Sequence, residues 1–168
     1  MSGPIERLYQ RMMMLVGIGR ITAGNDTGPS QQLQVSFGNG DVQDRLANLQ
    51  QYGFSSSPQP GADAVVLFIG GNRGNGVVIA TGDRRTRLVN LAPGEVALYT
   101  DEGDEVKLGR DGITIKAAIK LRIETPRLEV TGDIVDHCDA GTLTQAEERA
   151  RFNVHHHGGA GPNPTWVP

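Results

Sequence analysis

Cysteine, aromatic side chains and an excess of either charge are all scarce in this sequence of 168 residues. Its single cysteine, Cys138, cannot form an internal disulfide, so nothing points to an oxidising compartment. We expect Cys138 to be a small buried apolar residue, because free cysteines are among the most buried side chains. Aromatics make up 5% of the chain and the net charge is −3, which argues against a nucleic-acid-binding surface.

Long hydrophobic runs are missing as well. No stretch approaches the roughly 20 apolar residues that cross a membrane. The apolar run 12–16 is too short for a secretory signal, and it lacks a small-residue cleavage pattern. These features predict a soluble protein that is made in the cytosol.

Glycine and proline are plentiful, with 23 and nine residues respectively. This composition favours short strands and tight turns over packed helices. With 38% apolar residues, the core of a single chain is expected to be weak, and much apolar surface is expected to lie between subunits.

Segment 1–15 is the exception to this strand-like composition. Apolar residues recur there at helical spacing, behind a proline that the first turn of a helix tolerates. They are Ile5, Leu8, Met12 and Leu15, and the proline is Pro4. We expect a short amphipathic helix that packs on a neighbour, and the alternative is a frayed terminus.

Segment 16–90 has the pattern of a small β-barrel. Short apolar or alternating runs between glycine-rich turns occupy residues 17–21, 33–37, 64–69 and 76–80. The last two fit a hairpin, whereas residues 44–52 are expected to be irregular or briefly helical. Five or so short strands and a small helix in about 75 residues fit a barrel of the oligonucleotide/oligosaccharide-binding (OB) type.

Segment 91–141 contains the longest strict alternation in the chain. Apolar residues share one parity at positions 113, 115, 117, 119, 121 and 123, and the pattern resumes after Pro126. Short strands punctuated by glycine favour a β-solenoid or an intertwined β-prism. One chain alone would bury little of this narrow strip and would leave open strand edges. Three chains wrapped about one axis would bury every such face, so we expect a homotrimeric shaft.

Segment 142–168 begins with a stretch expected to be a short helix or loop, and it then holds three consecutive histidines. In an extended strand His155 and His157 project to one face, roughly 7 Å apart, while His156 points away. Two ligands rarely suffice for a transition metal, but three chains would supply six imidazoles. Six nitrogens suit iron, cobalt or nickel better than zinc or calcium, and they leave no open position for substrate. The alternative is an exposed histidine cluster without metal.

Taken in order, these segments resemble a known family. A small barrel, a glycine-punctuated prism entered at Gly132-Asp133-Ile134 and the run Phe152-Asn153-Val154-His155-His156-His157-Gly158 resemble the central tail spike of contractile-tailed phages. This family is also called baseplate assembly protein V, and the Mu-like branch is the most similar. The resemblance covers nearly the whole chain. It implies a mainly β homotrimer, with an N-terminal OB-fold-like barrel, an intertwined trimeric β-helix or β-prism and a metal-bound apex.

The resemblance also implies a function, a location and ligands. Such a spike pierces the host outer envelope when the tail contracts, and it closes the centre of the baseplate, where the barrel attaches to the tail hub. The chain would thus be part of the virion, assembled in the host cytoplasm and delivered to the host outer membrane. His155 and His157 of each chain would hold one iron ion per trimer in octahedral geometry. A spike from a pyocin or a type VI secretion particle is a close alternative.

Two other functions fit the sequence less well. A cell-wall-degrading enzyme would need a lysozyme domain between barrel and shaft, but the two segments meet near residue 90 without a convincing carboxylate pair. A nucleic-acid-binding OB domain would need aromatics on its strands, where Phe37 and Phe68 are the main candidates. We therefore expect neither enzyme activity nor a nucleic-acid partner.

Several polar clusters have a functional and a plain structural interpretation. Asp136, His137 and Asp139 would serve a second axial ion or a surface turn. The basic run 84–87 would contact an acidic hub surface or face solvent. The acidic run 101–105 misses the spacing of an EF-hand, and the glycine-rich stretch 70–76 precedes a strand instead of opening a helix. We expect an exposed turn and a barrel loop there.

Overall fold

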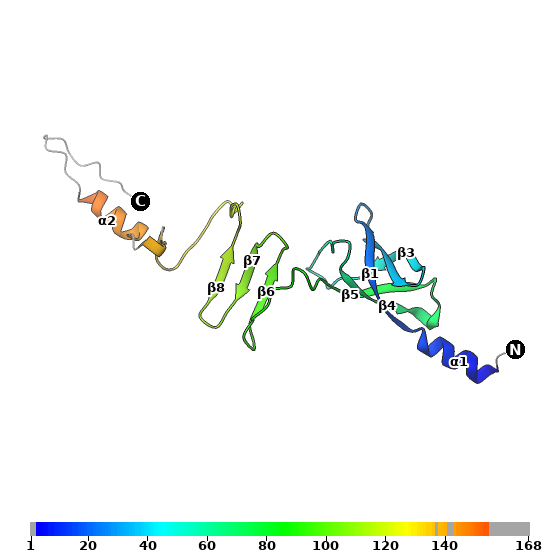
Figure 1. Ribbon diagram of the computed structural model, residues 1–168. Helices are drawn as coiled ribbons and strands as arrows, with labels where there is room; N and C mark the ends of the chain where they lie inside the picture. Colours follow the sequence, from blue (N-terminus) through cyan, green and yellow to red (C-terminus); the bar gives the residue numbers. More distant parts are fainter. Residues whose placement is uncertain (1–2, 137, 141–142, 155–168) are drawn as a thin grey trace. The chain divides into compact units, whose positions relative to one another are not determined.

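The computed structural model describes residues 3–136, 138–140 and 143–154, and the chain divides into two compact units, 1–121 and 122–168 (Figure 1). The elements of the first unit are α1 (Pro4–Met13), β1 (Val16–Asn25), β2 (Gln32–Gly38), β3 (Asp41–Asn48), β4 (Asp63–Phe68), the 3₁₀ helix η1 (Ile69–Gly71), β5 (Gly76–Gly82), β6 (Val96–Tyr99), β7 (Glu105–Leu108) and β8 (Ile113–Lys116). The second unit contains the 3₁₀ helix η2 (Cys138–Ala140) and α2 (Gln145–Asn153). Neither α1 nor α2 is long and apolar enough to cross a membrane.

Strands β1 to β5 close into a barrel of OB-like type in the order β1-β2-β3-β5-β4. The pairs are antiparallel except for β3 and β5, which run parallel. The predicted barrel and the β4–β5 hairpin are therefore confirmed, as is the helix at the start of the chain.

The expectation of an irregular or helical segment at residues 44–52 is wrong for residues 44–48 and holds for the irregular residues 49–52. Most of it belongs to β3, whose pairing with β2 shifts between the Leu33–Leu46 and Val35–Gln43 partners. Arg45 sits in this bulge with φ 56°, a left-handed conformation. The bulge interrupts the alternation of inward and outward side chains, and for that reason the sequence pattern does not reveal the strand.

The barrel interior forms a closed apolar core. Its buried side chains come from all five strands and the loop before β4: Ile21, Leu33, Val35, Leu46, Ala62, Ala64, Val66, Phe68 and Val78. Gly19 on β1 lets the strands approach, because a Cβ there would lie 2.6 Å from the Ser36 carbonyl oxygen. At one end of the barrel the Arg73 guanidinium covers the rings of Phe37 and Phe68, at 4.5 and 4.4 Å from their centroids, and pairs with Asp41. These cation–π contacts make Arg73 the cover of the core.

Strands β6, β7 and β8 form a separate antiparallel sheet in the order of the sequence. The strand predicted to continue to residue 123 ends at Lys116, and the described residues 117–134 contain no strand. Among the described parts of the chain this segment has no partner strand, and a strand without a partner leaves its backbone groups unpaired.

The second unit holds a helix that begins with a capping box. The Thr144 hydroxyl accepts a bond from the Glu147 backbone N–H at 3.1 Å, and the Glu147 carboxylate accepts one from the Thr144 N–H at 2.9 Å. Of the short helix or loop expected in this region, the helix is what forms. Cys138, by contrast, is exposed and not buried as expected, because it lies in the 3₁₀ turn η2 and does not belong to the buried apolar cluster.

Candidate assembly surfaces

The predicted metal ligands His155 and His157 lie outside the described residues. The run that contains them starts in a helix, since Phe152 and Asn153 end α2 and Val154 is its C-terminal cap. Within residues 3–136, 138–140 and 143–154, no group of three or more histidine, cysteine, aspartate or glutamate side chains could hold a metal ion. Asp139 is part of η2, and His137 lies outside the described residues, so a second ion site at Asp136, His137 and Asp139 stays a prediction.

One face of the β6–β7–β8 sheet is wholly apolar. The register places two rows of three side chains on it, Val96–Leu108–Ile113 and Leu98–Val106–Ile115. All are exposed except Val106, which is half-buried, and Ile113 is 69% exposed. The opposite face carries Ala97, Tyr99, Glu105, Lys107, Thr114 and Lys116. We call the six-residue apolar surface the shaft face.

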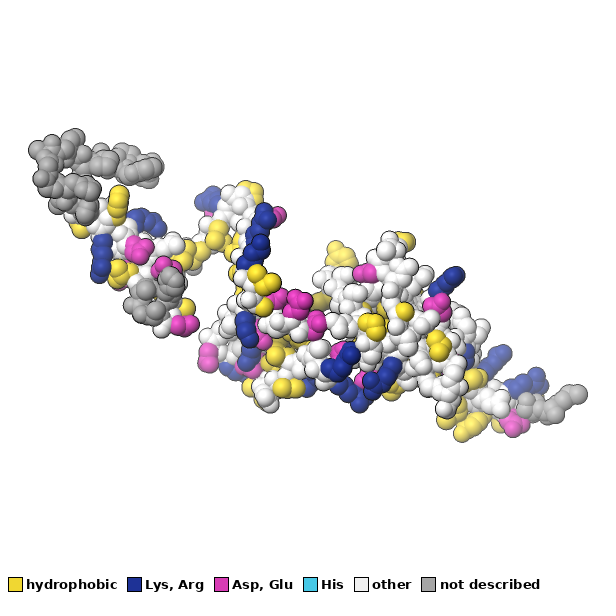
Figure 2. Space-filling model, turned by 45° about the horizontal axis from the view of Figure 1, so that its top comes forward, with side chains coloured by type: hydrophobic (Ala, Val, Ile, Leu, Met, Phe, Trp, Pro, Cys, Tyr) yellow, Lys and Arg dark blue, Asp and Glu magenta, His cyan; other side chains and the backbone are white. Residues whose placement is uncertain are grey.

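Apolar exposure continues beyond the sheet. Every residue from 111 to 136 is exposed, and Ile119 reaches 91%. Beyond β8, the other large apolar side chains on this segment are Leu121, Ile123, Leu128, Val130, Ile134 and Val135. Hydrophobic side chains reach the surface at many points of the molecule, as Figure 2 shows. Exposed apolar side chains in such number are typical of segments that contact other proteins.

The barrel carries a second apolar surface on the outside of β1, β4 and β5. Paired residues again form rows, Val16–Leu67–Val77 and Ile18–Val65–Ala80, with Ile79 beside them at a bulge. We call these seven residues the outer barrel face. Sequence reasoning missed this surface. The unbroken apolar run of β4 could have revealed it, because a strand that is apolar on both faces needs to be covered on both.

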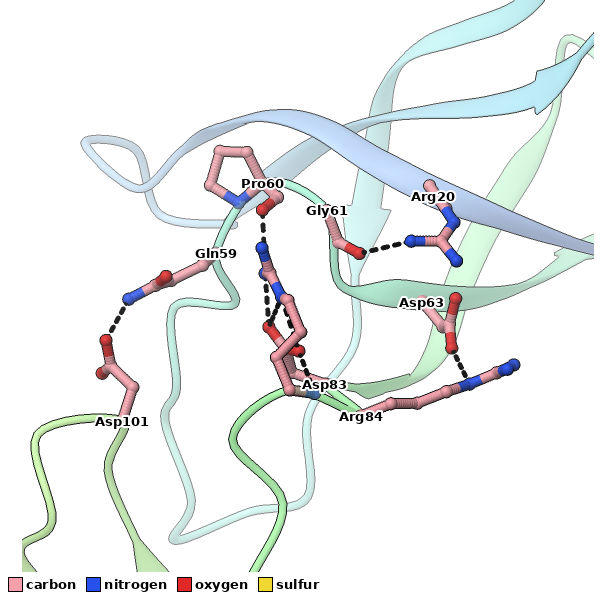
Figure 3. A network of polar contacts seen from close by, with 9 residues as sticks. Arg20, Gln59, Pro60, Gly61, Asp63, Asp83, Arg84 and Asp101 are labelled. Atoms are coloured by element: carbon pink, nitrogen blue, oxygen red, sulfur yellow. Dashed lines mark hydrogen bonds and ion pairs between the residues drawn. The ribbon is translucent and has the colours of Figure 1, made fainter.

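The basic run 84–87 is largely neutralised by carboxylates (Figure 3). Arg84 pairs with Asp63 at 2.7 Å, and Arg85 pairs with Asp83 at 2.5 Å while donating to the Pro60 carbonyl at 3.0 Å. Hydrogen bonds from Arg85 lower the pKa of Asp83 to about 2. These contacts fasten the loop before β4 to the barrel, so the run is a structural clamp more than a free cationic patch.

The same loop also reaches the three-stranded sheet. Gln59 donates a hydrogen bond to the carboxylate of Asp101, in the turn between β6 and β7 (Figure 3). Asp101 belongs to the acidic run 101–105, whose first three residues form the exposed turn that the sequence predicts. The glycine-rich stretch 70–76 likewise forms the turn between β4 and β5, as expected.

Comparison with known proteins decides among the function classes. Residues 19–85, the barrel, match the family described as Bacteriophage Mu Gp45, N-terminal. The chain is 32% identical over 135 residues to the baseplate puncturing device gp45 of Escherichia phage Mu, covering 76% of this chain and 68% of that protein. The chain belongs to the phage Mu gp45 family. It is also 31% identical over 125 residues to the Mu-like prophage FluMu protein gp45 of Haemophilus influenzae, covering 74% of this chain and 68% of that protein.

Membership of the gp45 family confirms the resemblance seen in the sequence. The chain is a homologue of a baseplate puncturing device, a phage tail spike, and it is a structural component of the phage baseplate. A baseplate component contacts other baseplate proteins.

Proposed function

We propose that three copies of this chain form the spike that pierces the host outer envelope when the phage tail contracts. The observation that carries the proposal is the shaft face, six apolar side chains on a small sheet, none of which the described residues bury. The exposed apolar side chains from Ile119 to Val135 likewise need other chains to bury them. Three chains that intertwine as a β-helix would bury both surfaces about one axis and pair the free strand edges.

The apex of such a spike needs a fastening, because three strand ends meet where the mechanical load is greatest. His155 and His157 are the candidate donors, and imidazole nitrogens from three chains suit an iron ion in octahedral geometry. With every position filled by protein, the ion would tie the chains together and take part in no reaction.

The proposed role is mechanical and includes no chemical step. Contraction of the tail supplies the work, and the trimer supplies a stiff, narrow shaft. The groove of about 440 Å³ at the barrel lends no support to a hydrolase, since its only carboxylate, Asp63, is paired with Arg84. A glycoside hydrolase needs two carboxylates that flank the scissile bond.

Molar mass in solution, measured together with metal content, tests this proposal. We expect a trimer with about one iron ion for three chains, and we expect the double variant His155→Ala/His157→Ala to lose the iron. A matched control is His156→Ala, whose side chain would point away from the ion in an extended strand. A monomer, or one metal ion for each chain, would contradict the proposal.

A further inference from the structure

Helix α1 carries an apolar surface that its own barrel does not cover. Five side chains form this helix stripe: Ile5, Leu8, Tyr9, Met12 and Met13. At about 100° per residue they fill an arc of roughly 140°, and the polar residues of the helix fill the rest. No residue of α1 is buried, and Ile5 is 85% exposed.

Helix α1 meets its own barrel at its last turn. Arg11, which lies opposite the stripe, approaches η1 so closely that a Cβ on Gly71 would collide with the Arg11 backbone. Gly71 also has φ 68°, a conformation that favours glycine. The short link to β1 is held as well, because the Phe68 N–H donates to the Leu15 carbonyl at 2.8 Å. These contacts hold the end of the helix, and the side chains of the helix stripe remain exposed.

A ten-residue helix in water is marginal without a partner for its apolar side. The same chain carries an uncovered sheet surface, the outer barrel face, on which Val16 and Ile18 are 56% and 69% exposed. The helix that precedes β1 thus leaves the start of that strand open. An unpartnered helix and an unpartnered sheet face are the two layers that globular proteins stack on each other.

The two surfaces match in size, chemistry and symmetry. The stripe is about 12 Å long from Ile5 to Met13, and three strands are about 10 Å across. Flexible methionine and leucine side chains suit a flat face of valine and isoleucine. A row of polar residues, Arg20 and Asp63, limits the face at one end. A contact between two different surfaces of one chain closes into a ring under three-fold symmetry.

We propose that the helix stripe of each protomer packs on the outer barrel face of the next protomer in the trimer. The proposal rests on the trimeric spike proposed above and assigns it a second set of contacts, at the barrels. The contact is smaller than the roughly 800 Å² per partner of a stable interface, so it adds to the shaft and does not replace it.

Cysteine cross-linking of the full chain tests this contact. In a Cys138→Ala background, the double variant Met12→Cys/Leu67→Cys is treated with a flexible bismaleimide. We expect covalent dimers and trimers on a denaturing gel, because every interface joins a helix to a neighbouring barrel. Met12→Cys with Tyr52→Cys, which lies outside the outer barrel face, is the matched control and should give far less product.

Each other result overturns the inference in a recognisable way. Cross-linking of Met12→Cys alone would show that the three helices pack on one another. Product at the mass of a single chain would show a helix that folds back on its own barrel. Trimers without any cross-link would assign both surfaces to another protein. If the uncross-linked variant and the parent are both monomeric, the proposed spike itself fails, which molar mass reveals independently.

A charge on the outer barrel face gives a second measurement. In the same double-cysteine chain, Ile18→Glu should abolish most of the cross-linking by placing an unpaired carboxylate under the stripe. The molar mass should remain that of a trimer, since the shaft is intact. Cross-linking that persists at the parental level would contradict the proposed contact.

Discussion

The barrel and the three-stranded sheet of this chain show two different ways of using apolar side chains. In the barrel, alternate residues point inward, and Val35, Val66 and Phe68 are fully buried within one chain. In the sheet, alternation is just as regular, yet none of the six residues of the shaft face is buried. The barrel closes on itself, whereas three short strands cannot enclose a core. The same alternation of apolar and polar residues thus leads to a core buried within one chain in the barrel and to an exposed apolar face in the sheet.

The barrel and the sheet are therefore expected to be stabilised by different contacts, the barrel by its own core and the sheet by other copies of the chain. The barrel is expected to remain folded when the chains are separated, because its core and its Arg73 cover come from one chain. The sheet is expected to depend on other copies, so its stability depends on protein concentration. Variants that separate these two behaviours give the sharpest tests.

The largest effect is expected from a charge on the shaft face. Ile115 lies on the edge strand β8, opposite Val106 of the centre strand β7. Ile115→Asp would therefore place a carboxylate from each of three copies at the proposed axis. An uncompensated buried charge costs several kcal/mol per ion. We expect the trimer to be replaced by monomers in a molar-mass measurement, while hydrogen exchange still protects the barrel strands.

The neighbouring substitution Thr114→Asp is the matched control. Thr114 lies on the polar face of the same strand, opposite Lys107, and should leave the trimer intact. If Ile115→Asp stays trimeric, the shaft face is not an interface. If the barrel loses its protection together with the trimer, the two regions are not independent.

A smaller effect, confined to the barrel, is expected from Phe68→Ala. Phe68 is completely buried, its ring lies 5.6 Å from that of Phe37, and it carries Arg73 on its face. Truncation of a buried phenylalanine costs about 3–5 kcal/mol. Hydrogen exchange in β1 and β4 should report this loss at fixed protein concentration.

Phe54→Ala provides the control for Phe68→Ala, because Phe54 is an exposed aromatic in the loop before β4. Its removal should change barrel protection by less than about 1 kcal/mol. Equal losses from the two variants would show that the barrel core is not the source of its stability.

The sequence allowed the barrel to be predicted because local patterns were sufficient. The apolar runs of β4 and β5, joined by a glycine-rich turn, indicate a hairpin without any knowledge of the neighbours. Strand β3 escaped prediction because Asp44 and Arg45 form a bulge, and a bulge shifts the alternation by one residue. Cys138 was misjudged because a residue's average burial says nothing of the turn in which it lies.

The functional surfaces were predictable to a different degree. The parity of Val96, Leu98, Ile113 and Ile115 was visible in the sequence, and so was the need for other copies to cover it. The outer barrel face was not recognised, because a continuous apolar run does not say which side of a strand faces the core. Only strand register separates Val65 and Leu67, which point outward, from Val66, which points inward. Tertiary pairing holds that information, and periodicity alone does not.

The smallest effect concerns the clamp that joins the barrel to its loop, and it depends on pH. Hydrogen bonds from the side chain and the backbone N–H of Arg85 lower the pKa of Asp83 from 3.8 to about 2. A carboxylate whose pKa is lowered by folding stabilises the protein at any pH above the pKa that the group has in the unfolded chain. This contribution disappears as the pH falls through the pKa that the group has in the folded protein. We therefore expect Asp83→Asn to lower the melting temperature slightly at pH 7, with a difference that shrinks between about pH 4 and pH 2.

Melting curves of parent and variant, recorded side by side at each pH, measure this difference. Asp111→Asn removes the same charge from an exposed turn before β8, and it leaves Arg85 with its partner. A difference that stayed constant down to pH 2 would mean that the side-chain amide perturbs packing and that the ion pair has no part in it. A vanishing difference would show that the barrel stabilises this loop by charge, whereas the shaft face can be stabilised only by other chains.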